Sequence, residues 1–336
     1  MTTLKDIAKT CELSVTQVSR ALNDCDDVSI STKIKVRKVA EELNYVKNIN
    51  ARRLVLKKSN QISVIICGFD RYKKDNDNIL MTVLNGIYNF AESINYEIVP
   101  FFVSKKNDES YLQYCKSRLI NGIIFIGARS DDEKFLEIIN SDFPCVTIDT
   151  LIKGKNKASI LIDDEYYSEL AVSEMINRGY KKIGMINGHE FAHVSLERQR
   201  GYESALKKHR IHMDESLIKC ANFEFNEASL KAKELIDENV DGIFCASDMM
   251  ALGALDEILK NNLKVPDDIA LFGFDGLLIT EFTNPKISTI AQDNFKKGYE
   301  AARILHKIVK RESYEKKVFV DCEIKITNSI GLLHNE

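Results

Sequence analysis

The chain has 336 residues, of which 44% are hydrophobic and 29% are charged, and this composition is typical of a folded protein with little extended disorder. Its length exceeds the size at which one hydrophobic core stops growing, so we expect at least two folding units. The N-terminus lacks the continuous apolar run of a secretory signal, and no later stretch reaches the roughly 18 apolar residues of a membrane span, so we expect a cytoplasmic protein without a membrane partner.

Charge is distributed unevenly along the sequence. Residues 1–60 contain 12 Lys and Arg against 7 Asp and Glu, whereas residues 61–336 contain 35 against 43. A basic segment followed by an acidic one indicates a polyanionic partner for the first segment alone. Chance variation in surface charge would explain the same numbers if no other feature supported this interpretation.

The first part of the chain has the pattern of three short helices. Capping residues stand at the expected helix starts: Thr3 with Asp6, Ser14 with Gln17, and Ser29. The first two helices, over about 4–11 and 14–23, are separated so tightly that they must cross steeply, which is typical of a helix-turn-helix. The residues expected to form their small core are Ile7, Ala8, Val18, Leu22, Ile34, Val36, Val39, Ala40 and Leu43.

From residue 61 onward, apolar strand-like runs alternate with amphipathic helices. Strands are predicted at 62–66, 98–103, 122–126, 145–148, 160–162, 183–186, 242–245 and 269–273. Helices are predicted at 80–93, 166–177, 198–208, 227–237 and 249–261. Continuous apolar strands indicate parallel sheets covered on both faces, and about 270 residues of this pattern favour two doubly wound units. Ligands bind such sheets beyond the carboxyl ends of the strands.

Several strings resemble the lactose/galactose repressor family. In the first sixty residues they are LKDIA (4–8), VTQVSRALN (15–23) and AEELNY (40–45), and in the rest of the chain DDE (163–165), RGY (178–180), SDMMALG (247–253), VPDDI (265–269), GFD (273–275) and AQD (291–293). Their number and order make coincidence very improbable. The resemblance implies an all-α helix-turn-helix head and an α/β body of two doubly wound parallel-sheet subdomains of the periplasmic-binding-protein-like type.

The resemblance also implies a division of the chain. Residues 1–47 would be the DNA-binding domain, 48–59 a hinge helix or linker, and 60–336 an effector-binding and dimerisation domain. The subdomains of the body would be about 60–160 plus 291–318 and 161–290 plus 319–336.

By this resemblance, the second helix of the head would lie in the major groove of a double-stranded operator. Val15 and Thr16 would touch bases, and Arg20 would read a guanine, whose O6 and N7 suit a guanidinium fork. The alternative is that Arg20 only decorates a surface helix. The full set expected at DNA from this domain is Thr3, Val15, Thr16, Gln17, Ser19, Arg20 and Asn23.

Residues 48–56 are short, basic and poorly amphipathic, so on their own they would form a marginal helix. Composition alone also fits a plain solvated linker. The resemblance implies a segment that folds on DNA, with Asn48 at its start, Ala51 permitting close approach and Leu54 inserted as an apolar wedge in the minor groove.

In the body, the expected effector is a small molecule, a sugar or a sugar phosphate, and no cofactor is expected. Arg198, after a predicted loop over 189–197, can clamp hydroxyls or a carboxylate, while Asp149 and Asp275 accept hydrogen bonds from hydroxyls. Structural salt bridging is the alternative for Arg198 and Asp275. Phe223 would form an apolar wall, a place that Phe225 could equally take. The remaining expected effector residues are Ile79, Ser247 and Asp248.

Two other classes of function share some of these features. A sugar-binding transport component would have the same body, but it would need an export signal and no helical head. A sugar-processing enzyme is disfavoured because the six histidines form no metal-ligand or catalytic pattern; His189 and His193 fall in the predicted loop. The eight cysteines, without a Cys-x-x-Cys pair, are typical of free thiols. The sequence therefore predicts a homodimeric, ligand-responsive repressor and not an enzyme.

Overall fold

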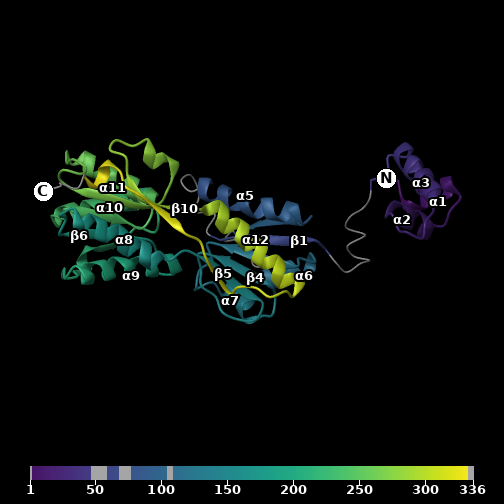
Figure 1. Cartoon of the computed structure of the whole chain (residues 1–336), viewed down its shortest axis with the longest axis horizontal. Helices are drawn as coiled ribbons and strands as arrows, with labels where there is room; N and C mark the ends of the chain where they lie inside the picture. The colour runs from purple at the N-terminus through teal and green to yellow at the C-terminus, as the bar shows by residue number, and fades with distance from the viewer. Residues whose placement is uncertain (1, 47–58, 68–76, 104–108, 332–336) are drawn as a thin grey trace. The chain divides into compact units, whose positions relative to one another are not determined.

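The computed structural model of the chain describes residues 2–46, 59–67, 77–103 and 109–331. The chain divides into two compact units, Met1–Lys58 and Ser59–Glu336, which we call the head and the body (Figure 1). The predicted hinge residues Asn48, Ala51 and Leu54 lie outside the described residues.

In its described residues, 2–46, the head contains three helices, as the capping residues predict. They are α1 (Leu4–Cys11), α2 (Val15–Leu22) and α3 (Ile30–Glu42). At the start of α2, Ser14 Oγ accepts a hydrogen bond from the backbone N–H of Gln17 at 3.1 Å, and Gln17 Oε1 accepts one from the N–H of Ser14 at the same distance. Glu12 adopts a left-handed conformation with φ 54° and ends α1, which permits the tight turn into α2.

One predicted core residue of the head is placed differently. Val36 and Ala40 are buried as predicted, but the side chain of Ile34 is 61% exposed. Two positions along an α-helix correspond to a rotation of about 200°, so Ile34 points away from the face that carries Val36. The buried residues of the head core are Ile7, Ala8, Cys11, Val18, Ala21, Val36 and Ala40.

The described residues of the body form two sheets, which Figure 1 shows in separate lobes. The first has the strand order β11-β5-β4-β3-β1-β2, and its strand pairs are parallel. Its strands are β1 (Gln61–Ile66), β2 (Glu97–Phe102), β3 (Gly122–Ile126), β4 (Cys145–Ile148), β5 (Lys157–Leu161) and β11 (Lys317–Phe319). Its helices are α5 (Asp77–Ser93), α6 (Tyr111–Ser117), α7 (Glu133–Asn140) and α12 (Asn294–Lys310).

The second sheet has the order β12-β10-β9-β8-β6-β7, parallel except for the antiparallel pair β10 and β12. Its strands are β6 (Ile183–Asn187), β7 (Ile218–Cys220), β8 (Gly242–Cys245), β9 (Ala270–Asp275), β10 (Ser288–Gln292) and β12 (Cys322–Lys325). Its helices are α8 (Asp164–Asn177), α9 (His193–Lys208), α10 (Phe225–Asp237) and α11 (Asp248–Lys260), with 3-10 turns η2 (Glu215–Leu217), η3 (Leu278–Glu281) and η4 (Asn328–Ile330).

The predicted class, a helical head on a doubly wound α/β body, is confirmed. The predicted loop over 189–197 is wrong in its second half, because α9 already begins at His193. Helices α6, α7 and α12 and the strands β7, β10, β11 and β12 were not among the elements predicted from the apolar pattern. Strands β5, β10 and β11 extend one or two residues past the predicted subdomain boundaries, to Leu161, Gln292 and Phe319.

Helices α5 and α12 pack against each other at very short range on the first sheet. A Cβ atom at Gly298 of α12 would lie 2.0 Å from the carbonyl oxygen of Val83, and one at Gly86 of α5 would lie 2.0 Å from that of Phe295. Glycine is therefore required at both contacts, and the pair fixes α12 on the first sheet, although α12 follows β10 of the second sheet in sequence.

Candidate DNA-binding surface and effector site

Helix α2 has one buried face and one exposed face. Val18 and Ala21 are fully buried, whereas Val15 is 41% exposed. The predicted DNA-contacting residues Thr3, Thr16, Gln17, Arg20 and Asn23 are exposed, and Ser19 is half-buried. An amphipathic helix of two turns with its polar face open to solvent can enter a major groove without disturbing the head core.

Two of these side chains have partners within the head. Gln17 uses its Oε1 to cap α2 at Ser14, which leaves its Nε2 for other contacts. Arg20 is paired with Asp27, which follows α2: Nε donates to Oδ1 at 3.1 Å, and Nη2 lies 2.7 Å from Oδ2. The hydrogen bond and the charge of Asp27 raise the pKa of Arg20, so this arginine is a fixed cation.

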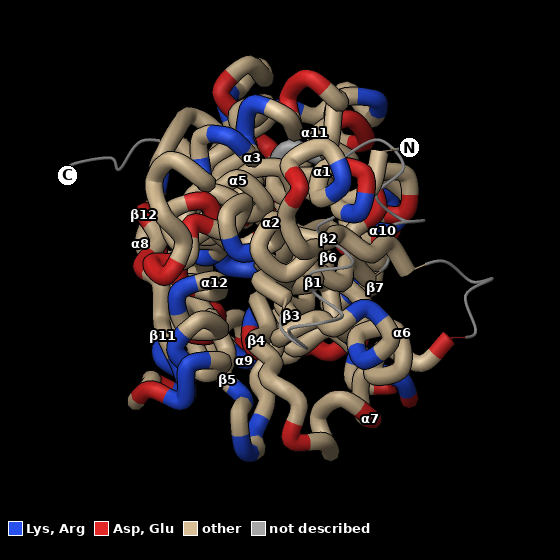
Figure 2. The backbone as a smooth tube through the Cα atoms, turned by 90° about the vertical axis from the view of Figure 1, so that its right-hand side faces the viewer, with Lys and Arg blue, Asp and Glu red and all other residues tan. Residues whose placement is uncertain are grey.

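The helical part of the head is not basic, although the first sixty residues taken together are. Residues 2–46 hold seven Lys and Arg and seven Asp and Glu, whereas residues 47–58 hold five Lys and Arg and no acidic residue. Figure 2 shows both signs of charge along the backbone of the head helices. The positive excess predicted to favour a polyanion therefore belongs to the segment after the helices.

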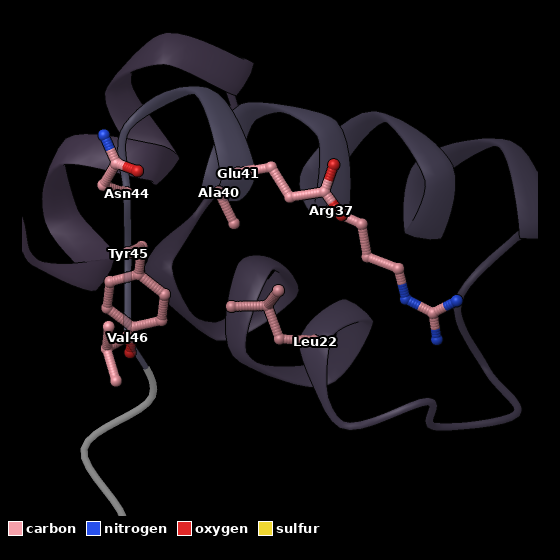
Figure 3. Close-up of a pocket in the computed structure, with 7 residues that line it drawn as sticks. All are labelled: Leu22, Arg37, Ala40, Glu41, Asn44, Tyr45 and Val46. Atoms are coloured by element: carbon pink, nitrogen blue, oxygen red, sulfur yellow. The ribbon is translucent and has the colours of Figure 1, made fainter.

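A hollow of about 560 Å³ lies on the head. Figure 3 shows the residues that line it, from the end of α2, from α3 and from the residues after α3. They are Leu22, Arg37, Ala40, Glu41, Asn44, Tyr45 and Val46. None of the predicted DNA-contacting residues lines this hollow.

In the body, charged side chains gather beyond the carboxyl ends of strands of both sheets. Asp149 follows β4, Asp248 follows β8 at the start of α11, and Asp275 ends β9. Arg198 lies in the first turns of α9 and is buried. These are the positions where open α/β sheets bind ligands.

Arg198 is held from several sides. Its Nε donates to Asp164 Oδ1 at 2.7 Å, and its Nη1 donates to the carbonyl oxygen of Ala246 at 2.6 Å. The guanidinium carbon lies 3.8 Å from the ring centroid of Phe274. Asp275 is more distant, with Oδ1 3.7 Å from Nη1. The predicted pair of Arg198 and Asp275 is thus close, but Asp164 is the stronger partner of the arginine.

A second group of contacts joins the two sheets. Lys297 of α12, which is fully buried, lies 2.9 Å and 2.7 Å from the carboxylate oxygens of Asp149 and donates to Gln292 Oε1 at 2.5 Å. The amide of Gln292 donates in turn to Asp275 Oδ1 at 2.7 Å. A continuous polar chain therefore runs from Asp149 on the first sheet to Arg198 on the second.

Ser247 and Asp248 serve the local fold. Ser247 caps α11 by accepting the N–H of Met250, and Asp248 accepts hydrogen bonds from Thr289 Oγ1 and from the N–H of Leu277, both at 2.7 Å. Asp248 is fully buried, and burial raises its pKa to about 6. These contacts tie β10 and the segment after β9 to α11.

Two of the predicted effector residues, Phe223 and Ile79, are apolar. Phe223 has a left-handed backbone with φ 64°, is half-buried, and stacks edge-on against His189 with ring centroids 5.7 Å apart. Phe225, the alternative to Phe223, begins α10 and is also half-buried. Ile79 of α5 is half-buried and packs against the main core.

Sequence reasoning missed three members of the polar cluster: Asp164, Gln292 and Lys297. Asp164 and Gln292 belong to the strings DDE and AQD, which carry the family resemblance. The sequence therefore drew attention to them but did not indicate that they contact the predicted effector residues. Nothing in the sequence indicated that Lys297 belongs to the cluster, because a lysine in a helix normally faces solvent.

Burial raises the pKa of two carboxyl groups in the cluster. It raises the pKa of Asp164, against the opposing effect of Arg198, and it raises the pKa of Asp275 to about 7, again opposed by Arg198. Within the described residues, no group of three His, Cys, Asp or Glu side chains could hold a metal ion. The arrangement places carboxylate acceptors beside the buried side chains of Arg198 and Lys297, which is chemistry for binding a polar ligand.

The helices of the described segments include none that is long and apolar enough to cross a membrane.

Comparisons with known proteins agree with this geometry. Residues 3–48 match the bacterial regulatory proteins of the lacI family, and residues 172–330 match a periplasmic binding protein-like domain. The HTH-type transcriptional repressor PurR of Vibrio atlanticus (strain LGP32) is 28% identical over 327 residues, covering 95% of each chain. The probable HTH-type transcriptional repressor ExuR of Bacillus subtilis (strain 168) is 29% identical over 338 residues, covering 99% of each.

Solved structures show the same fold. The lac repressor dimer bound to operator and the anti-inducer ONPF has a TM-score of 0.86 at 20% identity, covering 98% of this chain and 99% of that one. The complex of the transcriptional regulator CelR with cellobiose has a TM-score of 0.75 at 22% identity, covering 98% and 100%. The chain therefore belongs to the lacI family of bacterial regulatory proteins and is a ligand-responsive, DNA-binding transcriptional regulator, not an enzyme.

Proposed function

We propose that this regulator is a cytoplasmic repressor of a sugar-utilisation operon, which binds a palindromic operator as a homodimer and responds to a sugar or a sugar phosphate. The observation that carries the proposal is the combination of an exposed polar face on α2 with a buried charged cluster at the strand ends of the body. One head offers a small contact area, and a symmetric dimer places two recognition helices in successive major grooves.

On the DNA side, Arg20 reads a guanine, and Val15 and Thr16 touch neighbouring bases. Thr3, Gln17, Ser19 and Asn23 contact phosphates or base edges. The exposure of these residues, apart from the half-buried Ser19, and the buried opposite face of α2 support this assignment. Replacing Arg20 by alanine is expected to cost roughly 1 to 3 kcal/mol and to relax selection at one symmetric base position.

On the effector side, Asp149, Asp275 and the Arg198 guanidinium surround a ligand rich in hydroxyls, with Phe223 as an apolar wall. Carboxylates that accept hydrogen bonds from vicinal hydroxyls beside an aromatic face are typical of saccharide sites. The complex of CelR with cellobiose shows that a protein of similar fold binds a disaccharide. Ile79, Ser247 and Asp248 line or support this site.

The test is a thermal-shift screen of sugars, sugar acids, sugar phosphates, nucleobases and nucleosides, followed by operator titration with each ligand found. A ligand that binds the native state raises the unfolding temperature, and an effector also changes operator affinity. Incubation of each ligand with the protein and product analysis distinguishes a regulator from a sugar-processing enzyme. A screen in which only nucleobases or nucleosides stabilise the protein would contradict the saccharide assignment.

A further inference from the structure

The segment between α2 and α3 is unexpectedly acidic for a surface beside a recognition helix. It carries three carboxylates, Asp24, Asp26 and Asp27. A carboxylate near a phosphate backbone opposes binding, because affinity for DNA depends on neutralising phosphates. Asp24 pairs with Arg37 of α3. Within the described head, the side chain of Asp26 makes no ion pair or hydrogen bond, and Asp27 pairs with Arg20.

The geometry of the Arg20–Asp27 contact decides which donors remain free. Asp27 approaches the guanidinium from the side, with Oδ1 3.1 Å from Nε and Oδ2 2.7 Å from Nη2. A guanidinium has five N–H donors in a fixed fork. The side-on contact takes the one on Nε and one on Nη2, so both donors of Nη1 and the outer donor of Nη2 stay available.

The edge of the Arg20 guanidinium that Asp27 leaves free is the edge that binds guanine. Its outer N–H groups on Nη1 and Nη2 are parallel, and guanine presents O6 and N7 as two adjacent acceptors in the major groove. An arginine that is bound side-on by a carboxylate can therefore donate end-on to guanine without breaking the first contact. Both side chains are about half exposed, at 50% for Arg20 and 54% for Asp27, so the end of the arginine is accessible.

We propose that Asp27 is a specificity-determining residue that positions Arg20 for guanine and does not itself contact DNA. Arginine has a large rotamer entropy, and holding it in one orientation before binding removes part of the cost of ordering it on DNA. The charge of Asp27 also weakens attraction to phosphates at every sequence. Both effects increase the ratio of operator affinity to affinity for other DNA.

This inference rests on the proposed reading of a base by Arg20, and the experiment separates the two. An operator is first selected from random duplexes by the full-length wild-type protein. Affinities are then measured for that operator and for duplexes with single symmetric base-pair changes. Arg20→Ala identifies the base pair that Arg20 reads, because the affinity ratio at that pair alone falls to near one.

Asp27→Ala is then compared with Asp26→Ala. Both remove one negative charge from the same segment, but only the first removes the partner of Arg20. We expect Asp27→Ala to lower the affinity ratio at the Arg20 base pair by about two- to tenfold, from the ordering cost of one long side chain. Asp26→Ala is expected to leave this ratio unchanged, while both variants bind random DNA more tightly. In an Arg20→Ala background, Asp27→Ala should have no further effect on the ratio.

Equal ratios in Asp27→Ala and Asp26→Ala would overturn the inference and reduce Asp27 to a surface charge. A higher ratio in Asp27→Ala would also overturn it, because Asp27 would then compete with DNA for Arg20. If Arg20→Ala changes no base preference, the proposed base reading fails together with this inference. Thermal unfolding of each variant serves as the folding control.

Discussion

Arg198 and Asp164 form a buried ion pair, in which Nε and Oδ1 are 2.7 Å apart and the side chains are 5% and 4% exposed. The arginine expected to serve the ligand is thus also a structural residue of the second lobe. When Arg198 is replaced, the stability of the variant must therefore be measured together with its ligand binding.

Arg198→Ala is expected to lower the free energy of unfolding by roughly 3 to 5 kcal/mol, because it leaves the carboxylate of Asp164 buried without its partner. Urea unfolding measures this loss. Lys155→Ala, which removes an exposed ion pair with Asp142, is the control and should cost no more than about 1 kcal/mol. Unchanged stability in Arg198→Ala, together with lost ligand binding, would assign the arginine to the ligand alone.

Lys297→Met is expected to reduce the response of the protein to its effector. The lysine joins Asp149 on the first sheet to Gln292 on the second, so its removal breaks the polar chain between the sheets. Calorimetric titration of the ligand and operator titration with and without it measure the two effects. Lys296→Met, at the exposed neighbouring position, is the matched control. An identical ligand response in both variants would show that the chain carries no coupling.

The stability of the body should depend on pH through Asp275. Burial raises its folded-state pKa to about 7, above the value of about 3.9 in an unfolded chain. The unfolded state therefore loses its proton first, so this contribution to stability is present at acidic pH and is lost as the pH rises from about 4 to 7. Asp275→Asn should remove this pH dependence of the free energy of unfolding, whose slope is at most about 1.4 kcal/mol per pH unit.

The measurement is urea unfolding of wild type and Asp275→Asn at several values between pH 4.5 and 8, with the difference between them plotted against pH. Using the difference removes the opposite trend from carboxylates such as Glu169, whose pKa is lowered by Lys208. A difference that is constant over this range would show that Asp275 stays ionised in the folded state.

Leu54→Ala is expected to weaken operator binding sharply and to shrink the effect of the ligand on it, while ligand affinity stays close to normal. A ligand alters DNA affinity only through differential binding to two conformations of the body, and the chain joins body to head through residues 47–58. Paired operator titrations with and without effector test this. An unchanged ratio of the two affinities in the variant would refute coupling at this residue.

Local sequence patterns were enough to predict the role of a side chain that contacts its own helix or directly follows its own strand. Ser14 and Gln17 could be assigned as a cap because the contact spans three residues, and Asp149 and Asp275 could be placed because polar residues directly follow apolar strands. The prediction that Ile34 is buried was wrong because a single apolar residue in a helix does not reveal which face of the helix is buried. The helix start at His193 was missed because Ala192, which precedes it, makes no side-chain cap.

Other features depend on contacts between distant parts of the chain. Asp164 and Arg198 are 34 residues apart, and Lys297 and Asp149 are 148 apart. Their pairing follows from the packing of α8 against α9 and of α12 against the first sheet, which no local pattern encodes. Strands such as β11 and β12 are only three and four residues long, so their hydrophobic alternation is too short to distinguish from a loop.

The balanced charge of residues 2–46 has a consequence for how the regulator finds its site. Long-range attraction to DNA accelerates encounter and allows sliding, and its strength follows the number of basic residues near the phosphates. Because the surplus of Lys and Arg is confined to residues 47–58, the rate of search along the chromosome is set by the connecting segment, while the helices contribute recognition after arrival. Substitutions on the exposed face of α2 can therefore change which operator is chosen with little effect on the rate of search.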